Sequence, residues 1–146
     1  FIPLTDILTK YLRADEKALE DPNFFEISTT LMLYVIAGAI AELGNHDPVS
    51  RASASYITDG AIRVAIDGGP VATVLAKDHT LSVLAADTDT YTAYMRFADM
   101  RTARDLFDGR INAVAAVGMG LVRVGGMISQ VDNINRILDR VALYLA

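Results

Sequence analysis

Residues 61–76 read AIRVAIDGGPVATVLA, and this stretch decides the fold class. The apolar side chains of Ile62, Val64 and Ile66 alternate with shorter or polar ones, a pattern typical of a strand that buries one face. The Asp-Gly-Gly-Pro sequence at 67–70 predicts a tight turn, and a second apolar run follows at once. Because two strands joined by so short a turn pair antiparallel, the chain is expected to contain a β-sheet.

Four more runs of this kind lie outside that stretch, and turn sequences separate most of them. Asp59-Gly60 is typical of a two-residue hairpin turn, and the segment 87–90 favours a longer turn. Short connections favour a meander of neighbouring antiparallel strands. One sheet face is apolar and the other mixed, as expected when helices cover one side. The sequence predicts strands at 53–58, 61–66, 71–76, 81–86, 91–97 and 121–124.

Helical signals flank the predicted strands on both sides. Asn23 can cap a helix, with Glu26 three residues later as in a capping box, and Gly44 marks the C-terminal end of that helix. Asp99 and Asn112 are suitable N-caps for two short helices after the strands. Apolar residues also recur at helical spacing near both ends of the chain. The sequence therefore predicts helices at 4–12, 23–43, 100–108, 113–117 and 127–145.

Together these elements predict an α+β fold in a single domain, 1–146. An antiparallel sheet of five to six strands is covered on one face by helices. Two extra helices form an N-terminal extension at 1–48, and the sheet with the remaining helices forms the core at 52–146. The long C-terminal helix is expected to close over the apolar face of the sheet.

The run Leu31–Ala41 is unbroken and apolar over eleven residues. A membrane span needs about 20 apolar residues, so no transmembrane segment is predicted and a buried or interface helix is favoured. A helix that is apolar on all sides must be covered all round. In a small domain, a second copy of the chain is a plausible cover, which makes a homodimer through Leu31–Ala41 one expectation.

Composition excludes several classes of protein. Hydrophobic residues make up 52% of the 146 residues, too many for a disordered chain. There is no cysteine and there are two histidines, which excludes a disulfide scaffold and cysteine- or histidine-rich metal centres. The net charge of −5 makes nucleic acid an unsuitable partner. Without a visible signal peptide at its start, the chain is expected to be cytoplasmic.

Residues that carry chemistry are sparse. The Gly-rich segment at 118–120 lacks the Lys-Ser/Thr of a phosphate loop, and no serine lies in a Gly-x-Ser-x-Gly context. Tyr91, Tyr94 and Asp99 are the one cluster that could serve an enzyme such as an isomerase, but sheet packing and helix capping explain them more simply. The sequence therefore predicts a protein that is not an enzyme, with no catalytic residue, no metal and no cofactor.

Three arginines, Arg96, Arg101 and Arg104, fall close together around a predicted strand-to-helix junction. Because arginine binds carboxylates and phosphates through bidentate hydrogen bonds, these side chains could contact an anionic ligand. Local ion pairs explain them equally well. The aspartates available for such pairs are Asp99, Asp105 and Asp108.

Two segments of the C-terminal half resemble the sterol carrier protein 2 family. Residues 105–112, DLFDGRIN, are similar to its segment of leucine, two residues, glycine, a basic residue, an apolar residue and Asn or Asp. Residues 120–126, GLVRVGG, are similar to its strand Gly-Lys-Leu-Lys-Val-x-Gly-Asp. The likeness extends over about 52–145 and departs from the family at Leu121, in place of a lysine, and at Met127, in place of the final aspartate.

The resemblance implies a tunnel between sheet and helices that binds sterols, fatty acids, acyl-CoAs or other lipids. The first hypothesis is therefore non-catalytic binding or transport of a lipid in a hydrophobic cavity, with the closing helix moving to admit it. The alternative is a structural or interaction module in which the apolar helices form a homodimer interface and no ligand is bound. The residues expected to line the cavity are Phe107, Val117, Met119, Leu121, Met127, Val131, Ile134 and Leu138.

Overall fold

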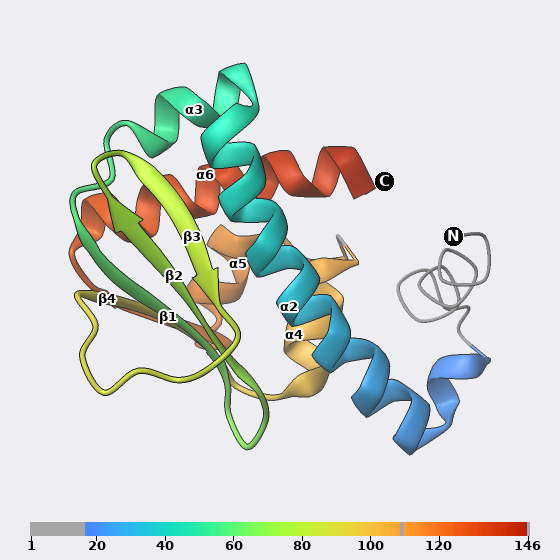
Figure 1. Cartoon of the computed structure of the whole chain (residues 1–146). Coiled ribbons are helices and arrows are strands. Elements are labelled where there is room, and N and C mark those ends of the chain that lie inside the picture. The colour runs from blue at the N-terminus through green and yellow to red at the C-terminus, as the bar shows by residue number, and fades with distance from the viewer. Residues whose placement is uncertain (1–16, 109, 146) are drawn as a thin grey trace.

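A five-stranded sheet forms at the apolar runs from residue 60 onward. The computed structural model describes residues 17–108 and 110–145. The strands form one sheet in the order β3-β2-β1-β4-β5 (Figure 1). The turn at 67–70 joins two antiparallel strands, as its sequence predicts. The strands are β1 (Gly60–Ile66), β2 (Val71–Lys77), β3 (Thr80–Leu84), β4 (Ala93–Phe97) and β5 (Val122–Gly126).

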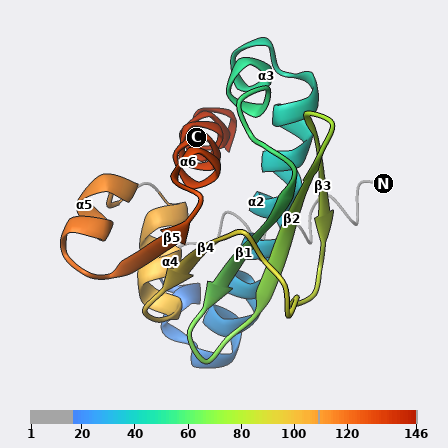
Figure 2. The same ribbon diagram turned by 90° about the vertical axis from the view of Figure 1, so that its left-hand side faces the viewer.

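Helices gather on one side of this sheet. Figures 1 and 2 show α2, α4 and α6 together on the face that carries the buried side chains of Ile62 and Val64. The opposite face carries no helix among the described residues. The described helices are η1 (Ala18–Glu20), α2 (Pro22–His46), α3 (Pro48–Ala54), α4 (Met100–Phe107), α5 (Ala113–Gly118) and α6 (Ile128–Leu145). The predicted α+β architecture with one covered face is confirmed, and the helix expected at 4–12 lies outside the described residues.

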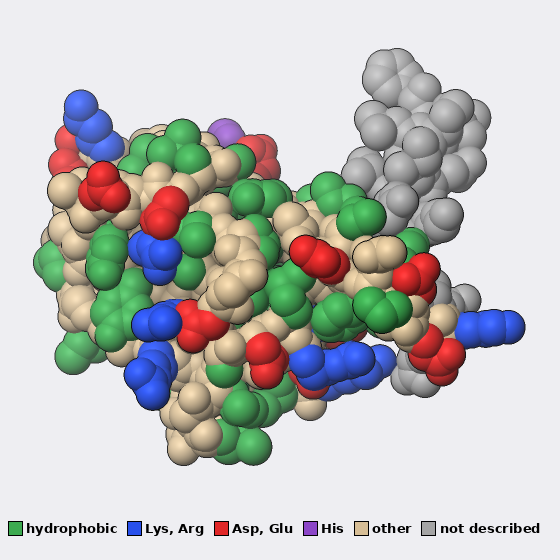
Figure 3. All heavy atoms as spheres, turned by 90° about the horizontal axis from the view of Figure 1, so that it is seen from below, with side chains coloured by type: hydrophobic (Ala, Val, Ile, Leu, Met, Phe, Trp, Pro, Cys, Tyr) green, Lys and Arg blue, Asp and Glu red, His purple; other side chains and the backbone are tan. Residues whose placement is uncertain are grey.

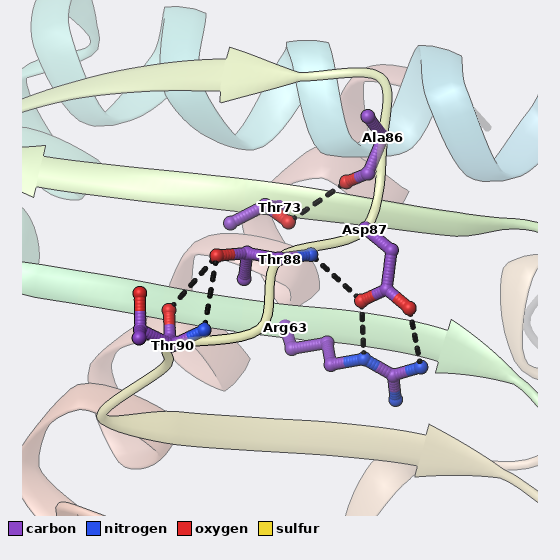
Figure 4. Close-up of polar contacts among 6 residues, drawn as sticks. All are labelled: Arg63, Thr73, Ala86, Asp87, Thr88 and Thr90. Carbon is purple, nitrogen blue, oxygen red and sulfur yellow. Dashed lines mark hydrogen bonds and ion pairs between the residues drawn. The ribbon is translucent and has the colours of Figure 1, made fainter.

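The expected meander is wrong at one connection, because the sheet is mixed. β4 pairs parallel with β1, with Ile62 opposite Ala93, while the other neighbours pair antiparallel. The segment 85–92 does not make a hairpin. It returns from the edge strand β3 across the helix-free face of β2 and β1 (Figure 4). The polar sequence at 87–90 favours any solvated connection, and therefore does not distinguish a turn from a crossover.

The strand expected at 53–58 is also wrong, because α3 occupies its first residues. Asp47 caps this helix by accepting a hydrogen bond from the backbone N–H of Ser50 at 2.9 Å, and Pro48 follows at the first helical position. An N-cap and a proline at that position start a helix regardless of the strand propensity that follows. The sheet therefore has five strands, and Asp59-Gly60 leads into β1 without a hairpin.

Helix α2 is longer at both ends than the sequence indicates. Asp21, not Asn23, is its N-cap and accepts a hydrogen bond from the Asn23 N–H at 3.0 Å. Gly44 lies inside the helix. A Cβ atom built on Gly44 would lie 2.5 Å from Cδ1 of Leu81 in β3. Gly44 thus allows α2 to approach the sheet closely, and the helix ends two residues later.

By length and composition, α2 is the one helix in the described ranges that could cross a membrane. In its most apolar window, 44% of the helix is buried inside the protein. Its inner side packs against β3, β2, α4 and α6, as the core helix of a folded domain does. The caps predicted for α4 and α5 are confirmed: Asp99 accepts from the Thr102 N–H and Asn112 from the Ala115 N–H, both at 2.7 Å.

Candidate functional site

An apolar cavity lies between the covered face of the sheet and helices α2, α4 and α6. Its volume is about 10 Å³, roughly what one water molecule needs. Phe97 and Phe107 meet edge to face at one part of its wall, with ring centroids 5.5 Å apart. The lining residues are all apolar: Leu33, Ile36, Ala37, Ile40, Val64, Met95, Phe97, Phe107, Ile134 and Leu138.

Three of the residues predicted to bind a ligand line this cavity: Phe107, Ile134 and Leu138. Val131 is buried in the same hydrophobic cluster, and Leu121 packs against its edge half-buried. The structure does not bring the remaining three to the cavity, since all are exposed and none belongs to its lining. These are Val117, Met119 and Met127.

Sequence reasoning missed the contribution of α2, which supplies four of the lining residues. Leu33, Ile36, Ala37 and Ile40 recur at helical spacing along one side of the run Leu31–Ala41. That spacing is the ordinary signature of a buried helix face. It is hidden here because the intervening positions are apolar as well, so the run has no polar side for contrast.

Polar side chains interrupt the apolar contact between α2 and α4. Arg104 is 1% exposed. Its Nε donates to Oδ2 of Asp108 at 2.9 Å, and its Nη1 donates to Oγ of Ser28 at 2.5 Å. Thr29, next to Ser28, is fully buried, and its Oγ1 has no hydrogen-bond partner. A buried arginine is rare unless it is paired, and Arg104 with Ser28 and Asp108 forms a polar cluster within this apolar contact.

The helix-free face of the sheet holds a second, open hollow of about 630 Å³. Arg63 of β1 donates to both carboxylate oxygens of Asp87, at 2.7 and 3.1 Å (Figure 4). The Asp87 carboxylate also accepts from the Thr88 N–H at 2.7 Å. The Arg63 hydrogen bond first, and the Thr88 N–H second, lower the pKa of Asp87. Arg63 and Asp87 therefore neutralise one another at the edge of this hollow.

The crossover 85–92 is fastened to the sheet by further hydrogen bonds. Thr73 of β2 donates through Oγ1 to the Ala86 carbonyl at 2.9 Å, and within the crossover itself Thr88 donates through Oγ1 to the Thr90 carbonyl at 3.0 Å (Figure 4). A second arginine of this face, Arg96, forms an ion pair with Asp67. Seen from below, acidic and basic side chains lie interspersed with apolar ones (Figure 3). Through its contacts with Arg63 and Thr73, the segment is held against the helix-free face of the sheet.

The residues weighed for catalysis take structural positions. Tyr91 and Tyr94 meet edge to face, with ring centroids 6.0 Å apart, and Asp99 caps α4. One of the two histidines, His46, lies at the exposed end of α2, where its Nε2 is 3.7 Å from Oε1 of Glu42. Within residues 17–108 and 110–145, no three His, Asp or Glu side chains are grouped so that they could hold a metal ion.

Comparisons with known proteins bear on the fold. No protein-family model and no curated protein match the sequence. Solved structures do match. A UbiJ-SCP2 ubiquinone synthesis protein superposes with a TM-score of 0.53 at 19% identity, over 77% of this chain and 93% of its own.

Two sterol carrier structures give similar values. The sterol carrier protein domain 2 of Helicoverpa armigera has a TM-score of 0.59 at 13% identity, over 76% of this chain and 88% of its own. A crystal structure of sterol carrier protein 2 has a TM-score of 0.52 at 13% identity, over 76% and 92%. At such identities the likeness shows the fold alone. The chain has the fold of sterol carrier protein 2 domains.

Proposed function

We propose that this chain binds a lipid or similar apolar ligand between the sheet and helices α2, α4 and α6, and carries it without changing it chemically. The observation that carries the proposal is the position of the apolar cavity. It lies where three helices meet the covered sheet face, and every side chain in its wall is apolar. Small-molecule sites are concave and mostly apolar. The fold shared with sterol carrier proteins supports the same function.

The cavity has to enlarge when a ligand binds, because about 10 Å³ holds no lipid chain. Helix α6 is the element best placed to move. It contributes Ile134 and Leu138 to the wall, and its outer side is exposed at Asp132 and Arg136. A cavity that becomes substantial only in a minor conformation is a known way of binding apolar ligands.

The direct test is to purify the protein without detergent, extract it with organic solvent and identify co-purified lipids by mass spectrometry. Displacement of the neutral dye Nile red by added lipids measures binding independently. Leu138→Trp fills the cavity wall and is expected to abolish both signals, whereas Met119→Trp, at an exposed site, is expected to leave them unchanged. If no lipid co-purifies and none displaces the dye, the proposal is wrong.

A structural role through a homodimer remains the alternative, and the outer side of α2 is the observation that favours it. Ile27 is exposed, and Leu31, Tyr34 and Val35 are half-buried. Sedimentation velocity of the wild type and of a Leu31→Glu, Val35→Glu variant tests this role. A dimer that becomes a monomer in the variant supports it, and a wild-type monomer contradicts it.

A further inference from the structure

The strand β3 forms one edge of the sheet. It pairs with β2 alone, and α2 lies beside it (Figure 2). The N–H and C=O groups on the outer side of an edge strand attract other strands, and natural proteins protect them with lysine, proline, a bulge or a covering element. Residues 80–86 read TLSVLAA and contain neither a charged residue nor a proline. The side chains of β3 therefore provide no such protection.

Asn45, at the end of α2, bonds to this edge from outside the sheet. Its Nδ2 donates to the Leu81 carbonyl at 2.7 Å, and its Oδ1 accepts from the Leu81 N–H at 2.8 Å. A side-chain amide offers a donor and an acceptor, as a peptide group does, whereas an ionised aspartate has no donor and a lysine has no acceptor. Asn45 therefore bonds Leu81 as a residue of a sixth strand would.

Two further contacts hold the α2–α3 junction at this edge. Gly44 lets the end of α2 approach β3 closely, because a Cβ atom there would lie 2.5 Å from Cδ1 of Leu81. Arg51 of α3 donates through Nη1 to the carbonyl of His79, in the turn that leads into β3. The junction is thus attached to the edge at two residues, Leu81 through Asn45 and His79 through Arg51.

Val83 is the next residue whose backbone faces outward. Successive residues of an antiparallel strand bond to opposite sides, so the N–H and C=O of Val83 point away from β2 as those of Leu81 do. Within residues 17–108 and 110–145, no hydrogen bond reaches these two groups. Strands in proteins are usually three residues or longer, and Val83 alone offers one donor and one acceptor. With Leu81 occupied, the edge is too short for a second strand.

We propose that the outer edge of β3 is a pairing surface for a second copy of this chain, and that Asn45 and Arg51 keep it closed. The inference is independent of ligand binding. The edge suits a second copy because two β3 strands that pair antiparallel match N–H groups with carbonyls. No charged side chain of residues 80–86 meets its own copy in such a pair. Because both copies use the same edge, pairing about a two-fold axis ends at a dimer.

Sedimentation velocity of the full chain over a range of concentrations tests the proposal. The double variant Asn45→Ala, Arg51→Ala removes both attachments and is expected to dimerise about tenfold more tightly than the wild type, or more. If it does not fold, Asn45→Ala alone is expected to change dimerisation in the same direction. The exchange of the Val83 amide with solvent should slow in the dimer, because that N–H becomes paired. The matched control is Asn133→Ala, which removes a bond of 2.7 Å to the Ser129 carbonyl within α6 and should sediment like the wild type.

A third substitution separates strand pairing from general loosening of the fold. Val83→Pro removes the outward N–H without removing a bond to β2, and proline is tolerated on edge strands at such positions. Added to the double variant, it is expected to restore the sedimentation of the wild type. If the triple variant does not fold, Ser82→Lys, at an exposed position, places a charge on the edge strand and is expected to have the same effect.

Three results would overturn the proposal. The first is a double variant that sediments like the wild type at every concentration. The second is a dimer of the double variant that persists when Val83→Pro or Ser82→Lys is added, because the contact would then lie away from the edge of β3. The third is a dimer that Leu31→Glu, Val35→Glu dissociates, because the outer side of α2 would then form the contact.

Discussion

Arg140 of α6 reaches Asp47, the residue that ends α2 and caps α3, with 3.2 Å between Nε and Oδ2. The Asp47 side chain is 1% exposed and also accepts from the Ser50 N–H. One carboxylate therefore starts a helix and holds the closing helix against the α2–α3 junction. Any movement of α6 away from the cavity has to break or stretch this ion pair.

Replacing Arg140 by methionine is expected to loosen α6. The hydrogen bond to the buried carboxylate is lost. Because the arginine is partly exposed, the loss is moderate, and the free energy of unfolding should fall by about 1–2 kcal/mol. Because the open conformation loses nothing, the rate of Nile red uptake should rise. Stopped-flow fluorescence measures that rate. An unchanged rate in a folded, destabilised variant would show that α6 does not control access to the cavity. Arg136→Met, which breaks a more exposed ion pair on the same helix, is the control.

Two glycines of α2 are expected to respond in opposite directions to alanine. Gly44→Ala places a Cβ 2.5 Å from the Leu81 side chain, and overpacking of this kind costs about 1–3 kcal/mol. Gly38 has open space around it, so Gly38→Ala should stabilise the helix by about 1 kcal/mol through propensity alone. Urea unfolding measures both. Stabilisation by both substitutions would mean that α2 does not approach β3 as closely as described.

The five strands of the sheet and the helices α4 and α5 were predictable because each has a local signal, whereas α3 was not predicted. Alternation at Ile62, Val64 and Ile66 marks β1, and Asp99 marks the start of α4. The parallel pairing of β1 with β4 was not predictable, because it depends on a crossover whose contacts with the sheet, such as Arg63 with Asp87, join residues far apart in sequence. Turn composition is the same for a hairpin and a crossover.

The candidate site was predictable only in part, for a similar reason. The stripe of α6 that contains Ile134 and Leu138 stands out against polar neighbours, so periodicity identifies it. The inner side of α2 does not stand out within an apolar run. The polar cluster depends on the packing of α2 against α4, which places Ser28 beside Arg104, 76 residues apart in the chain.

The ion pair between Arg63 and Asp87 should make the free energy of unfolding depend on pH. The pKa of Asp87 is lowered in the folded chain, mainly by the Arg63 hydrogen bond. A lowered pKa means that this contribution is present above the unfolded-state pKa and is lost as pH falls through the folded-state pKa. In Arg63→Met the Asp87 pKa should rise toward the ordinary value of about 3.9, as followed by carboxyl ¹³C NMR. The control is Arg123→Met, on the same sheet face, which should leave the Asp87 pKa lowered. A rise of the Asp87 pKa in both variants would mean that the overall charge of the face, and not the hydrogen bond, lowers it in the wild type.

Enlarging the cavity should lower the free energy of unfolding and raise the affinity for an apolar ligand. Ile134→Ala removes a buried side chain from the cavity wall and should cost about 2–5 kcal/mol in unfolding free energy. The space it leaves adjoins the existing cavity, so less movement of α6 is needed to admit an apolar chain and Nile red should bind more tightly. Val49→Ala, at an exposed site on α3, should change stability by less than about 0.5 kcal/mol and leave dye binding unaltered. Equilibrium urea unfolding and dye titration give the two quantities, and weaker dye binding by a folded Ile134→Ala would place the ligand site elsewhere.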